Sequence, residues 1–445
     1  MRYIYSKYLY IIIDDDKGVI MYSTKTGNMV YLEDKEFEDI KAYLKGVISS
    51  NDTINSMIEY GFLVSDETDE VKNIIDEHLY SLENSKVFHL TVYLTEECNF
   101  NCEYCFVKKT GRVMDKQCFN QLYRFLEKMI EEYSEIDISW FGGEPLIRIE
   151  ELIEYNKMIN DLCVKNGKNY NSSLVTNGYY LTPHNFLKLY NSNVTNIQVT
   201  FDGAKNKHDS MRIDRKEGSN FDIIMKNLRK IQKMSFDKCY IIIRCNYEVG
   251  NKMSYPKEFL KIYNKFFLRD RRFTLTLKPI VNHHETDEQK LLSIYKGRAD
   301  ALCDIVGEYT QYADLLMQLI MPRKYWCNSF SRNSYVVNTM GEIYMCDSVI
   351  NRQEYKLGFI AEDGNIKIHK EYKLYSDVRE HLLKELKGCL NCKRLPICYG
   401  SCNKIYALLG KRACSISDSD IEKLLRMYSK IYHERISVER CQEKC

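Results

Sequence analysis

Hydrophobic positions follow three different patterns along the chain, and the first pattern covers residues 1 to about 85. Short apolar runs predict three strands there, and stretches in which apolar residues recur at helical spacing predict three short helices. Strands followed by short helices outline a winged-helix-like domain. The predicted strands are Tyr8–Ile13, Val19–Tyr22 and Met29–Leu32, and the predicted helices are 34–45, 53–60 and 68–83.

The second pattern, from about 88 to 320, alternates strand-like and helix-like stretches. Six β/α units predict a parallel sheet with right-handed crossovers, curled into a partial, TIM-like (β/α)6 barrel. Chemistry in such an α/β fold is expected at the carboxyl ends of the strands. The predicted strands are Phe88–Leu94, Ile136–Phe141, Ser173–Thr176, Ile197–Phe201, Tyr240–Cys245 and Phe273–Pro279, and the helices are 115–133, 148–165, 183–191, 221–234 and 256–268.

The alternation ends near residue 322, where cysteines become frequent, and a last helix is predicted at about 419–435. We therefore predict three domains, comprising residues 1–85, 86–321 and 322–445.

Charge separates the first domain from the rest. Residues 1–85 hold eight Lys and Arg against 17 Asp and Glu, a net charge of −9, although the whole chain carries +2. A winged helix that reads DNA needs a cationic face, so this charge argues against nucleic acid as a partner. A module that docks a peptide or protein is the better interpretation, and an inert cap domain is the alternative.

The chain shows neither an export signal nor a membrane span. The apolar run at its start is followed at once by Asp14, Asp15 and Asp16, and no stretch of about 18 uncharged apolar residues occurs. We expect a cytoplasmic protein, in which thiols stay reduced. The 17 cysteines then point to metal sites or redox chemistry rather than to disulfides.

Three cysteines follow the first predicted barrel strand with the spacing C-x3-C-x2-C, at Cys98, Cys102 and Cys105. Three thiolates on one loop can hold three irons of a [4Fe–4S] cluster and leave the fourth iron open. Structural zinc is the alternative, but it requires four ligands, and neither a His nor a fourth Cys is nearby in the sequence.

This motif, together with Gly142-Gly143-Glu144-Pro145 at the end of the second strand, resembles the radical S-adenosylmethionine (radical SAM) superfamily. The resemblance implies that a reduced cluster cleaves S-adenosylmethionine to a 5′-deoxyadenosyl radical, which abstracts hydrogen from carbon. Asn177-Gly178 and Asp202-Gly203 follow the third and fourth strands, and such pairs form turns at strand ends in proteins that bind no ligand. A purely structural turn is therefore the alternative for the contacts predicted there. The implied cofactor contacts are Tyr104, Gly142, Gly143, Glu144, Pro145, Thr176, Asn177, Thr200, Asp202, Arg244 and Asn246.

Seven further cysteines are similar in spacing to the SPASM extension of radical SAM enzymes. The resemblance implies two auxiliary [4Fe–4S] clusters, which together with the cluster of the first motif makes three. The resemblance assigns Cys389, Cys392, Cys398 and Cys414 to one cluster and Cys327, Cys346 and Cys402 to the other. The fourth ligand of the Cys327, Cys346 and Cys402 cluster could be Cys441, Cys445 or a thiol of the substrate, or the fourth position could be open. A zinc ribbon is the alternative. The five cysteines expected to be buried, small hydrophobic residues are Cys118, Cys163, Cys239, Cys245 and Cys303.

Asp347 follows a predicted cluster ligand, as an Asp does in anaerobic sulfatase maturases, where it takes a proton from the substrate; we expect it to be catalytic. His208 and Arg212 resemble an H-x3-R pattern of peptide-modifying members, with a solvated ion pair as the alternative.

The sequence favours a maturase of ribosomally made peptides that forms a thioether or carbon–carbon cross-link. Its acidic first domain resembles the element that recognises the leader of a precursor peptide, which would add a strand to the sheet edge. A flavodoxin or ferredoxin is the expected electron donor. The alternatives are a sulfatase-type maturase that makes formylglycine and an iron–sulfur or zinc-binding regulator.

Overall fold

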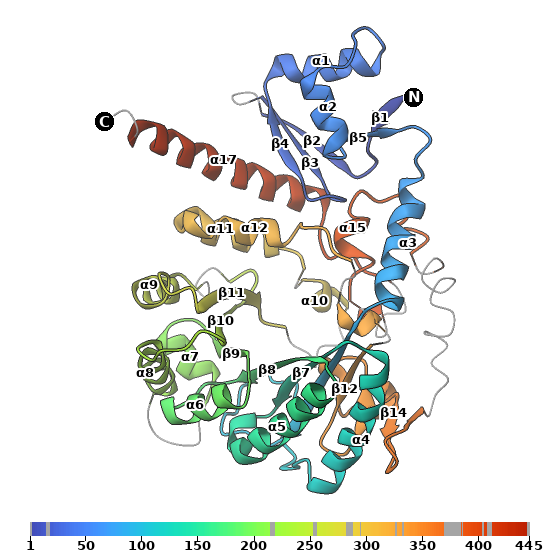
Figure 1. Cartoon of the computed structure of the whole chain (residues 1–445). Coiled ribbons are helices and arrows are strands. Elements are labelled where there is room, and N and C mark those ends of the chain that lie inside the picture. Colours follow the sequence, from blue (N-terminus) through green and yellow to red (C-terminus); the bar gives the residue numbers. More distant parts are fainter. Residues whose placement is uncertain are drawn as a thin grey trace. The chain divides into compact units, whose positions relative to one another are not determined.

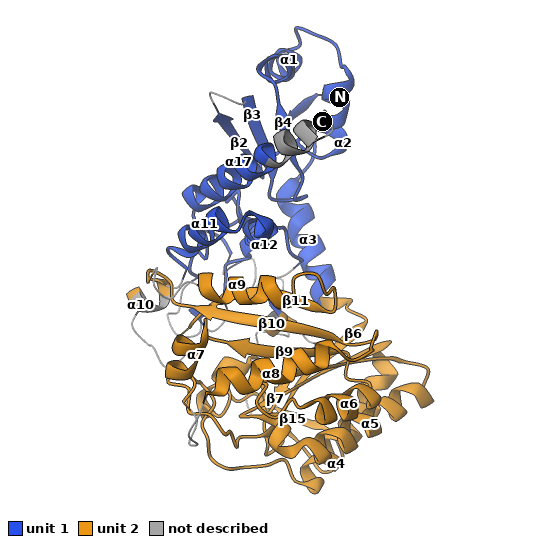
Figure 2. Cartoon of the chain, turned by 90° about the vertical axis from the view of Figure 1, so that its left-hand side faces the viewer, with its two compact units in different colours: residues 1–82, 295–327, 377–445 blue, residues 83–294, 328–376 orange. Residues whose placement is uncertain are grey.

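The computed structural model describes residues 2–14, 18–213, 219–251, 256–281, 288–293, 295–324, 327–331, 333–368, 384, 386–402, 405–406 and 412–442. The chain divides into two compact units (Figure 2). Unit 1 comprises residues 1–82, 295–327 and 377–445, and unit 2 comprises residues 83–294 and 328–376. Among the described helices, none is long and apolar enough to cross a membrane.

Unit 2 is built on a ten-stranded sheet, in which the six predicted barrel strands lie in sequence order (Figure 1). All five pairings among these six strands are parallel, so the α/β barrel architecture predicted from the alternating pattern is confirmed. The strands are β6 (Val87–Thr95), β7 (Glu135–Gly142), β8 (Asn169–Thr176), β9 (Asn196–Phe201), β10 (Tyr240–Tyr247) and β11 (Phe273–Pro279).

Amphipathic helices connect these strands, and their first turns are capped by the side chains that the sequence supplies. The side chains of Asp115, Thr182 and Ser219 each accept a hydrogen bond from the backbone of their helix, which stabilises its start. The helices begin and end close to the predicted positions: α4 (Lys116–Glu132), α5 (Ile149–Lys165), α6 (Pro183–Asn191), α8 (Asn220–Gln232) and α9 (Lys257–Phe266), with the short α7 (Lys205–Met211) between β9 and α8.

Four more strands extend the sheet beyond β6. Strand β12 (Ser334–Val337) pairs in parallel with β6, and β13 (Glu342–Tyr344), β14 (Gly358–Ile360) and β15 (Ile366–Ile368) follow as antiparallel neighbours. Part of the predicted C-terminal domain thus belongs to the barrel sheet. The chain changes unit at 82/83 and at 327/328, close to the predicted boundaries at 85 and 321, but residues 1–82 share a unit with residues 295–327 and 377–445, and the three-domain division remains a prediction.

Unit 1 contains the three predicted N-terminal strands as the antiparallel sheet β2–β3–β4, which is covered on both faces. Leu9, Val19 and Met21 pack with the helices α1 and α2 in one hydrophobic core, whereas Tyr10 and Tyr22 point to the other face and bond to Asp418 and Ile320. The elements are β2 (Leu9–Asp14), β3 (Gly18–Ser23), β4 (Met29–Leu32), α1 (Asp34–Leu44), α2 (Asp52–Glu59) and α3 (Glu70–Glu83), with the strand pair β1 (Tyr3–Tyr5) and β5 (Leu63–Ser65).

The second face of that sheet meets the C-terminal helix α17 (Asp418–Gln442), which is longer than the predicted 419–435. Tyr31 on β4 stacks on Tyr432 with ring centroids 5.7 Å apart, and Arg426 donates to the carbonyl of Ile13. Helices α11 (Arg298–Glu308) and α12 (Asp314–Gln318) pack against α17 as well. The N-terminal strands therefore share one folded unit with the C-terminal end of the chain.

Candidate active site

The predicted site residues of unit 2 follow the carboxyl ends of neighbouring parallel strands. The three-cysteine loop comes after β6, Gly142 ends β7 and is followed by Gly143 to Pro145, Thr176 ends β8 and is followed by Asn177, and Asp202 follows β9. Arg244 and Asn246 lie in the second half of strand β10. Since parallel strands end at one edge of a sheet, the fold brings these residues to the same side.

Cys98, Cys102 and Cys105 are all partly buried on their loop. Burial raises the pKa of the Cys98 thiol to about 12, and the charges of Glu144 and Cys102 add to this shift. Three thiols of one loop are a donor set that suits an iron–sulfur cluster. Among the described residues, no three His, Cys, Asp or Glu side chains are already gathered as a metal site, so the ligand set is inferred from the chemistry of the thiols.

The paired glycines after β7 allow two backbone segments to approach closely. A Cβ atom on Gly143 would lie 2.1 Å from the carbonyl oxygen of Glu97, and one on Gly142 would lie 2.1 Å from that of Thr95. The Gly143 N–H donates to Thr95 at 2.8 Å, and the Glu144 N–H donates to Glu97 at 2.7 Å. The glycines thus fix the chain that leads into Cys98, a role that the sequence analysis did not assign to them.

Glu144 is fully buried, and three donors hold its carboxylate. One oxygen accepts from the N–H of Leu146 at 3.0 Å and from the hydroxyl of Thr176 at 2.7 Å, and the other accepts from the N–H of Asn177 at 2.7 Å. Burial raises the pKa of Glu144, although these three hydrogen bonds oppose the shift. A carboxylate has about four acceptor positions, so one remains for a ligand such as an ammonium group.

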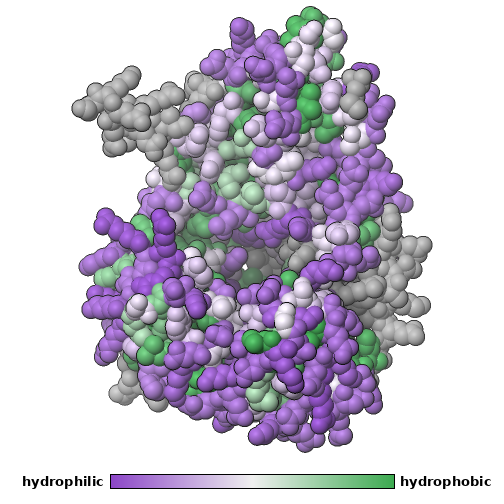
Figure 3. Space-filling model, in the orientation of Figure 1, coloured by the Kyte–Doolittle hydropathy of each residue, from purple (hydrophilic) through white to green (hydrophobic). Residues whose placement is uncertain are grey.

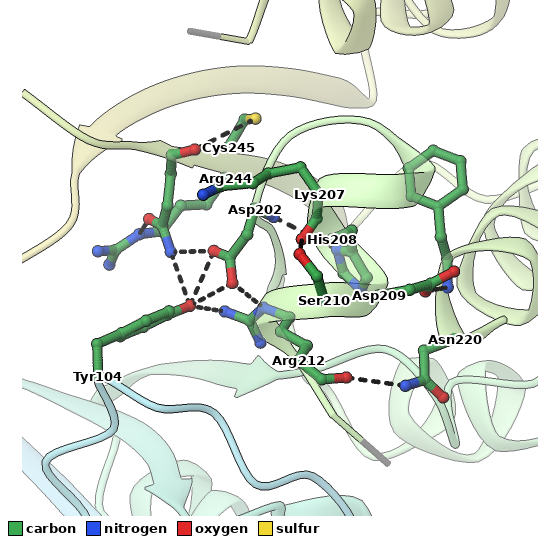
Figure 4. Close-up of polar contacts among 12 residues, drawn as sticks. Tyr104, Asp202, Lys207, His208, Asp209, Ser210, Arg212, Asn220, Arg244 and Cys245 are labelled. Atoms are coloured by element: carbon green, nitrogen blue, oxygen red, sulfur yellow. Dashed lines mark hydrogen bonds and ion pairs between the residues drawn. The ribbon is translucent and has the colours of Figure 1, made fainter. Parts of the chain in front are cut away.

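Tyr104 of the three-cysteine loop forms a buried network with Asp202 and Arg212 (Figure 4). The Tyr104 hydroxyl contacts both carboxylate oxygens of Asp202, at 2.8 and 2.6 Å, and Arg212 pairs with the same carboxylate at 2.9 Å. Burial on its own would raise the pKa of Asp202, but Arg212 and the hydrogen bonds from Tyr104 and Asn246 lower it below its usual range. The carboxylate is therefore ionised, and it anchors the loop to β9.

Asn246 and Arg244, both on β10, join this network, and Arg244 is labelled in Figure 4. Asn246 donates to Asp202 at 2.8 Å, and Arg244 donates to Asn246 at 2.9 Å. Burial removes water from the Arg244 guanidinium and thereby lowers its pKa. The strand ends therefore carry a partly desolvated cation. Of the other predicted contacts, Thr200 is buried on β9, and Pro145 begins a 3₁₀ turn, Pro145–Arg148.

His208 and Arg212 are both buried, so the alternative of a solvated ion pair between them is wrong. The backbone N–H of Asp202 donates to Nδ1 of His208 at 3.3 Å, and Arg212 pairs with Asp202 instead. Burial lowers the pKa of His208 to about 3, so its ring is neutral. It packs among Phe201 and Phe221 and orients the segment that carries Asp202.

Asp347 begins a short 3₁₀ turn after β13, and it accepts the backbone N–H of Ser348 at 2.8 Å and the Cys346 thiol at 3.5 Å. Its charge acts on Arg244 and on the fully buried Tyr93 of β6. Tyr93 also lies within the electrostatic reach of both Cys105 and Cys346. Asp347 is thus on the side of the sheet where the strand-end residues meet.

Two residues at this site escaped the sequence analysis. Glu96 is fully buried and accepts hydrogen bonds from Thr110 on the three-cysteine loop, and from Thr339 and Asn351 on the segment around β13. It therefore ties that segment to the loop. Asn99 accepts from the Asn177 side chain at 2.8 Å, and its own buried Nδ2 has no partner, which leaves a donor for a ligand. In the sequence, the only indication that Glu96 and Asn99 belong to the site is that they lie next to Cys98 in the chain.

The C-terminal cysteines divide between the two units. Cys327, Cys389, Cys392, Cys398, Cys402 and Cys414 lie in unit 1, and Cys346 lies in unit 2. The charges of Cys392, Cys398 and Cys414 all act on the thiol of Cys389, whose pKa is raised by burial first and by these neighbours next. Three neighbouring thiols that act electrostatically on a fourth are a donor set whose chemistry suits the cluster predicted for them. Cys445 lies outside the described residues, as does the side chain of Cys441.

The five cysteines predicted to be hydrophobic residues are buried, which confirms that prediction: Cys118, Cys163, Cys239, Cys245 and Cys303.

An open hollow of about 500 Å³ lies on the outer side of helices α8 and α9, where Figure 3 shows a largely hydrophilic surface. Its lining residues include the basic Lys226, Arg229, Lys230 and Lys233 and the aromatic Phe221 and Phe266. It contains none of the predicted site residues.

Comparison with known proteins identifies the class of this site. Residues 92–245 match the radical SAM superfamily. The cysteine-type anaerobic sulfatase-maturating enzyme of Clostridium novyi (strain NT) is 25% identical over 334 residues, which are 70% of this chain and 86% of that enzyme. Residues 92–245 thus form a radical SAM domain within unit 2.

Two solved structures resemble the fold. Native anSMEcpe with bound AdoMet has a TM-score of 0.55 at 18% identity, covering 79% of this chain and 98% of that one. Streptococcus suis SuiB bound to the precursor peptide SuiA has a TM-score of 0.52 at 14% identity, covering 93% of this chain and 99% of that one.

Proposed function

We propose that this enzyme modifies a ribosomally made precursor peptide and joins two of its residues by a thioether or a carbon–carbon bond. The observation that carries the proposal is the N-terminal part of unit 1, whose described residues form five strands and three helices ahead of the radical SAM domain. The likeness to SuiB supports it, since it extends over 93% of this chain, against 79% for anSMEcpe.

Cys98, Cys102 and Cys105 would hold the reactive iron–sulfur cluster, and the strand-end residues would hold S-adenosylmethionine. The chemistry available when both are bound is abstraction of a hydrogen atom from carbon. Glu144 and Asn99 each have a free hydrogen-bonding position for the ligand. The predicted C-terminal cysteines would hold two auxiliary clusters, with the fourth ligand of the Cys327, Cys346 and Cys402 cluster left open.

The buried network orients these groups and limits the access of water. Arg212, Asn246 and Tyr104 fix the carboxylate of Asp202, so the loop that carries the three cysteines keeps one position relative to β9. Arg244 presents a cation suited to a carboxylate or to ribose oxygens. Preorganised polar groups of this kind position a reactant without reorganisation during the reaction.

Asp347 would act as the general base. Formation of a thioether from a thiol and a C–H bond removes two hydrogens: one leaves as a hydrogen atom, and the other leaves as a proton together with one electron. The Asp347 carboxylate is partly exposed and would take the proton. An oxidised auxiliary cluster near Cys346 is the acceptor that we propose for the electron.

The leader of the precursor would dock on the N-terminal sheet. Strands β2 and β4 are its edges, and an extended peptide can add a strand to such an edge. Because this region carries a net charge of −9, a leader with basic residues would be attracted to it. A flavodoxin or ferredoxin remains the proposed electron donor.

The second candidate is a formylglycine-generating maturase of the sulfatase type. It is favoured by the 25% identity to the sulfatase-maturating enzyme, which covers 86% of that protein. Asp347 would serve as the base in this reaction too. The N-terminal fold weighs against it, since oxidation of a short sulfatase motif needs no leader-binding module.

Anaerobic reconstitution with iron and sulfide, followed by incubation with S-adenosylmethionine, dithionite and the peptide encoded beside the gene, tests both candidates. A product lighter by two hydrogens supports a cross-link. An aldehyde trapped by a hydrazine would instead support formylglycine formation. The absence of 5′-deoxyadenosine would overturn both.

A further inference from the structure

The N-terminal strands and helices pack directly on the cysteine-rich loop of unit 1. Tyr8, Ile74, Ile75 and Leu79 form one hydrophobic cluster with Leu386, Leu395 and Tyr399, and Cys389 packs against it. The ring of His78 stacks on Tyr399, with centroids 4.1 Å apart, and the Thr24 hydroxyl donates to the carbonyl of Lys393. The proposed leader-binding domain is therefore in contact with a proposed cluster-binding loop.

A chain of polar contacts leads from this domain to one cysteine. The hydroxyl of Tyr10, on β2, donates to Oδ1 of Asp418. The same oxygen lies 3.5 Å from Nε of Arg394. Nε of Arg394 in turn donates to the sulfur of Cys392 at 3.3 Å, and its Nη1 donates to the carbonyl of Ile416 at 2.6 Å.

Arg394 therefore has two competing acceptors at one nitrogen. The Cys392 sulfur and Oδ1 of Asp418 both contact Nε. Oδ1 also accepts a hydrogen bond from the Tyr10 hydroxyl, which leaves it a weaker acceptor for Arg394. Loss of the Tyr10 hydroxyl would free Oδ1 to bind Nε more strongly. The guanidinium would then donate less to the sulfur.

Hydrogen bonds and positive charge at a ligand sulfur stabilise the reduced, more negative state of an iron–sulfur cluster. We propose that Arg394 is a positioning residue which raises the reduction potential of the auxiliary cluster at Cys389, Cys392, Cys398 and Cys414, and that Tyr10 of the N-terminal sheet controls the strength of this effect through Asp418. This inference rests on the proposed function, because it assumes that these four cysteines hold a cluster.

The test is a potentiometric titration, followed by electron paramagnetic resonance, of the full-length reconstituted protein. The cysteines Cys98, Cys102 and Cys105 are changed to Ala in every sample, so that only auxiliary signals remain. The signal that disappears in a further Cys392→Ala variant is the one followed. Arg394→Gln is expected to shift its potential downward, and Tyr10→Phe is expected to shift it downward by a smaller amount.

Asp418→Asn gives the opposite sign. Removal of the competing carboxylate leaves Nε to the sulfur and removes a nearby negative charge, so the potential is expected to rise. Two matched controls change the same residue types away from the sulfur. Tyr22→Phe removes a hydroxyl on the same face of the sheet that donates to Ile320, and Arg426→Gln removes a guanidinium that donates to Ile13. Both are expected to leave the potential unchanged.

Iron content separates the two ways in which the inference could fail. A wild-type potential in both Arg394→Gln and Tyr10→Phe, at full iron content, would overturn the inference and leave the proposed function intact. Absence of any auxiliary signal in the protein with Cys392 present would overturn the auxiliary-cluster assignment and the inference with it. Because Tyr10→Phe removes a single oxygen, it keeps the test open if Arg394→Gln does not fold.

Discussion

Tyr104 donates from its hydroxyl to the carboxylate of Asp202, although the first residue lies between two cysteines of the loop after β6 and the second follows β9. The contact spans 98 positions of sequence and is completed by Arg212, which bonds to both partners. It therefore holds the proposed cluster loop to a strand three places away in the sheet.

Tyr104→Phe should slow the cleavage of S-adenosylmethionine without unfolding the protein. A hydrogen bond to a charged group contributes about 1.5–3 kcal/mol, so we expect kcat/KM for 5′-deoxyadenosine formation to fall by roughly 10- to 150-fold. Tyr190→Phe is the matched control, since Tyr190 donates to Asp237 at an exposed position. Equal rates in both variants would contradict the proposed role of the loop anchor.

Arg212→Ala should destabilise the protein strongly, because it leaves the buried Asp202 carboxylate without its cation. The expected loss is about 3–5 kcal/mol in the free energy of unfolding by urea. The pH dependence has a defined sign. The pKa of Asp202 is lowered in the folded state, so its stabilising effect is present above the pKa of the unfolded chain and is lost as the pH falls through the folded value.

Asp202→Asn removes this titration. The free energy of unfolding of the wild type should therefore decline more steeply on acidification below about pH 4 than that of the variant. Parallel pH curves would show that Asp202 does not contribute in this way.

Gly143→Ala should disturb the three-cysteine loop, because the new methyl group would lie 2.1 Å from the carbonyl oxygen of Glu97. We expect the signal of the reactive cluster to be lost or reduced severalfold in electron paramagnetic resonance. Gly388→Ala serves as the control, since nothing lies within 4 Å of its added Cβ. A normal cluster signal in Gly143→Ala would mean that the loop tolerates displacement.

Leu79→Ala should lower both stability and iron content. Leu79 is 6% exposed and lies in the cluster that joins the N-terminal helices to the cysteine-rich loop, so its truncation should cost about 2–5 kcal/mol. Leu187→Ala, at a residue that is 43% exposed, should cost much less. A protein that begins near residue 86 would lack the N-terminal side chains that cover Leu386, Leu395 and Tyr399. Such a truncation would disturb the cysteine-rich loop as well as the leader-binding sheet. Single surface substitutions on the sheet are therefore the better test of leader docking.

Asp347→Asn should separate the two halves of the proposed reaction. Formation of 5′-deoxyadenosine should continue, whereas the modified peptide should decrease by roughly 100-fold or more, because the proton has no base to receive it. Asp363→Asn, in a turn where the carboxylate accepts the N–H of Asn365, is the control. Equal loss of both products would place Asp347 in cofactor binding instead.

The barrel could be predicted almost strand by strand because its signals are local. Buried apolar runs, helical periodicity and capping residues such as Asp115 each act within a few positions. The addition of β12 to β6 was not predictable in the same way. It depends on pairing between Ser334 and His89, which are distant in sequence, and a four-residue strand carries no mark of its partner.

The site was predicted in its components more than in its contacts. Motif spacing picked out Tyr104, Asp202 and Asn246, but not that they bind one another. Glu96 was missed because a buried carboxylate next to a motif looks, in sequence, like any solvated acid. The packing of Tyr8 on the cysteine-rich loop was missed because composition suggested an independent domain.

The register of β12 on β6 has a consequence for how such an enzyme can diversify. Val337 lies opposite Val92, and Cys346 and Asp347 follow β12 and β13 on the same sheet that ends in the three-cysteine loop. The hydrogen bonds between these strands thus fix the distance between the proposed base and the proposed reactive cluster. Substitutions outside these strands can therefore change which substrate is admitted without changing the spacing between the two.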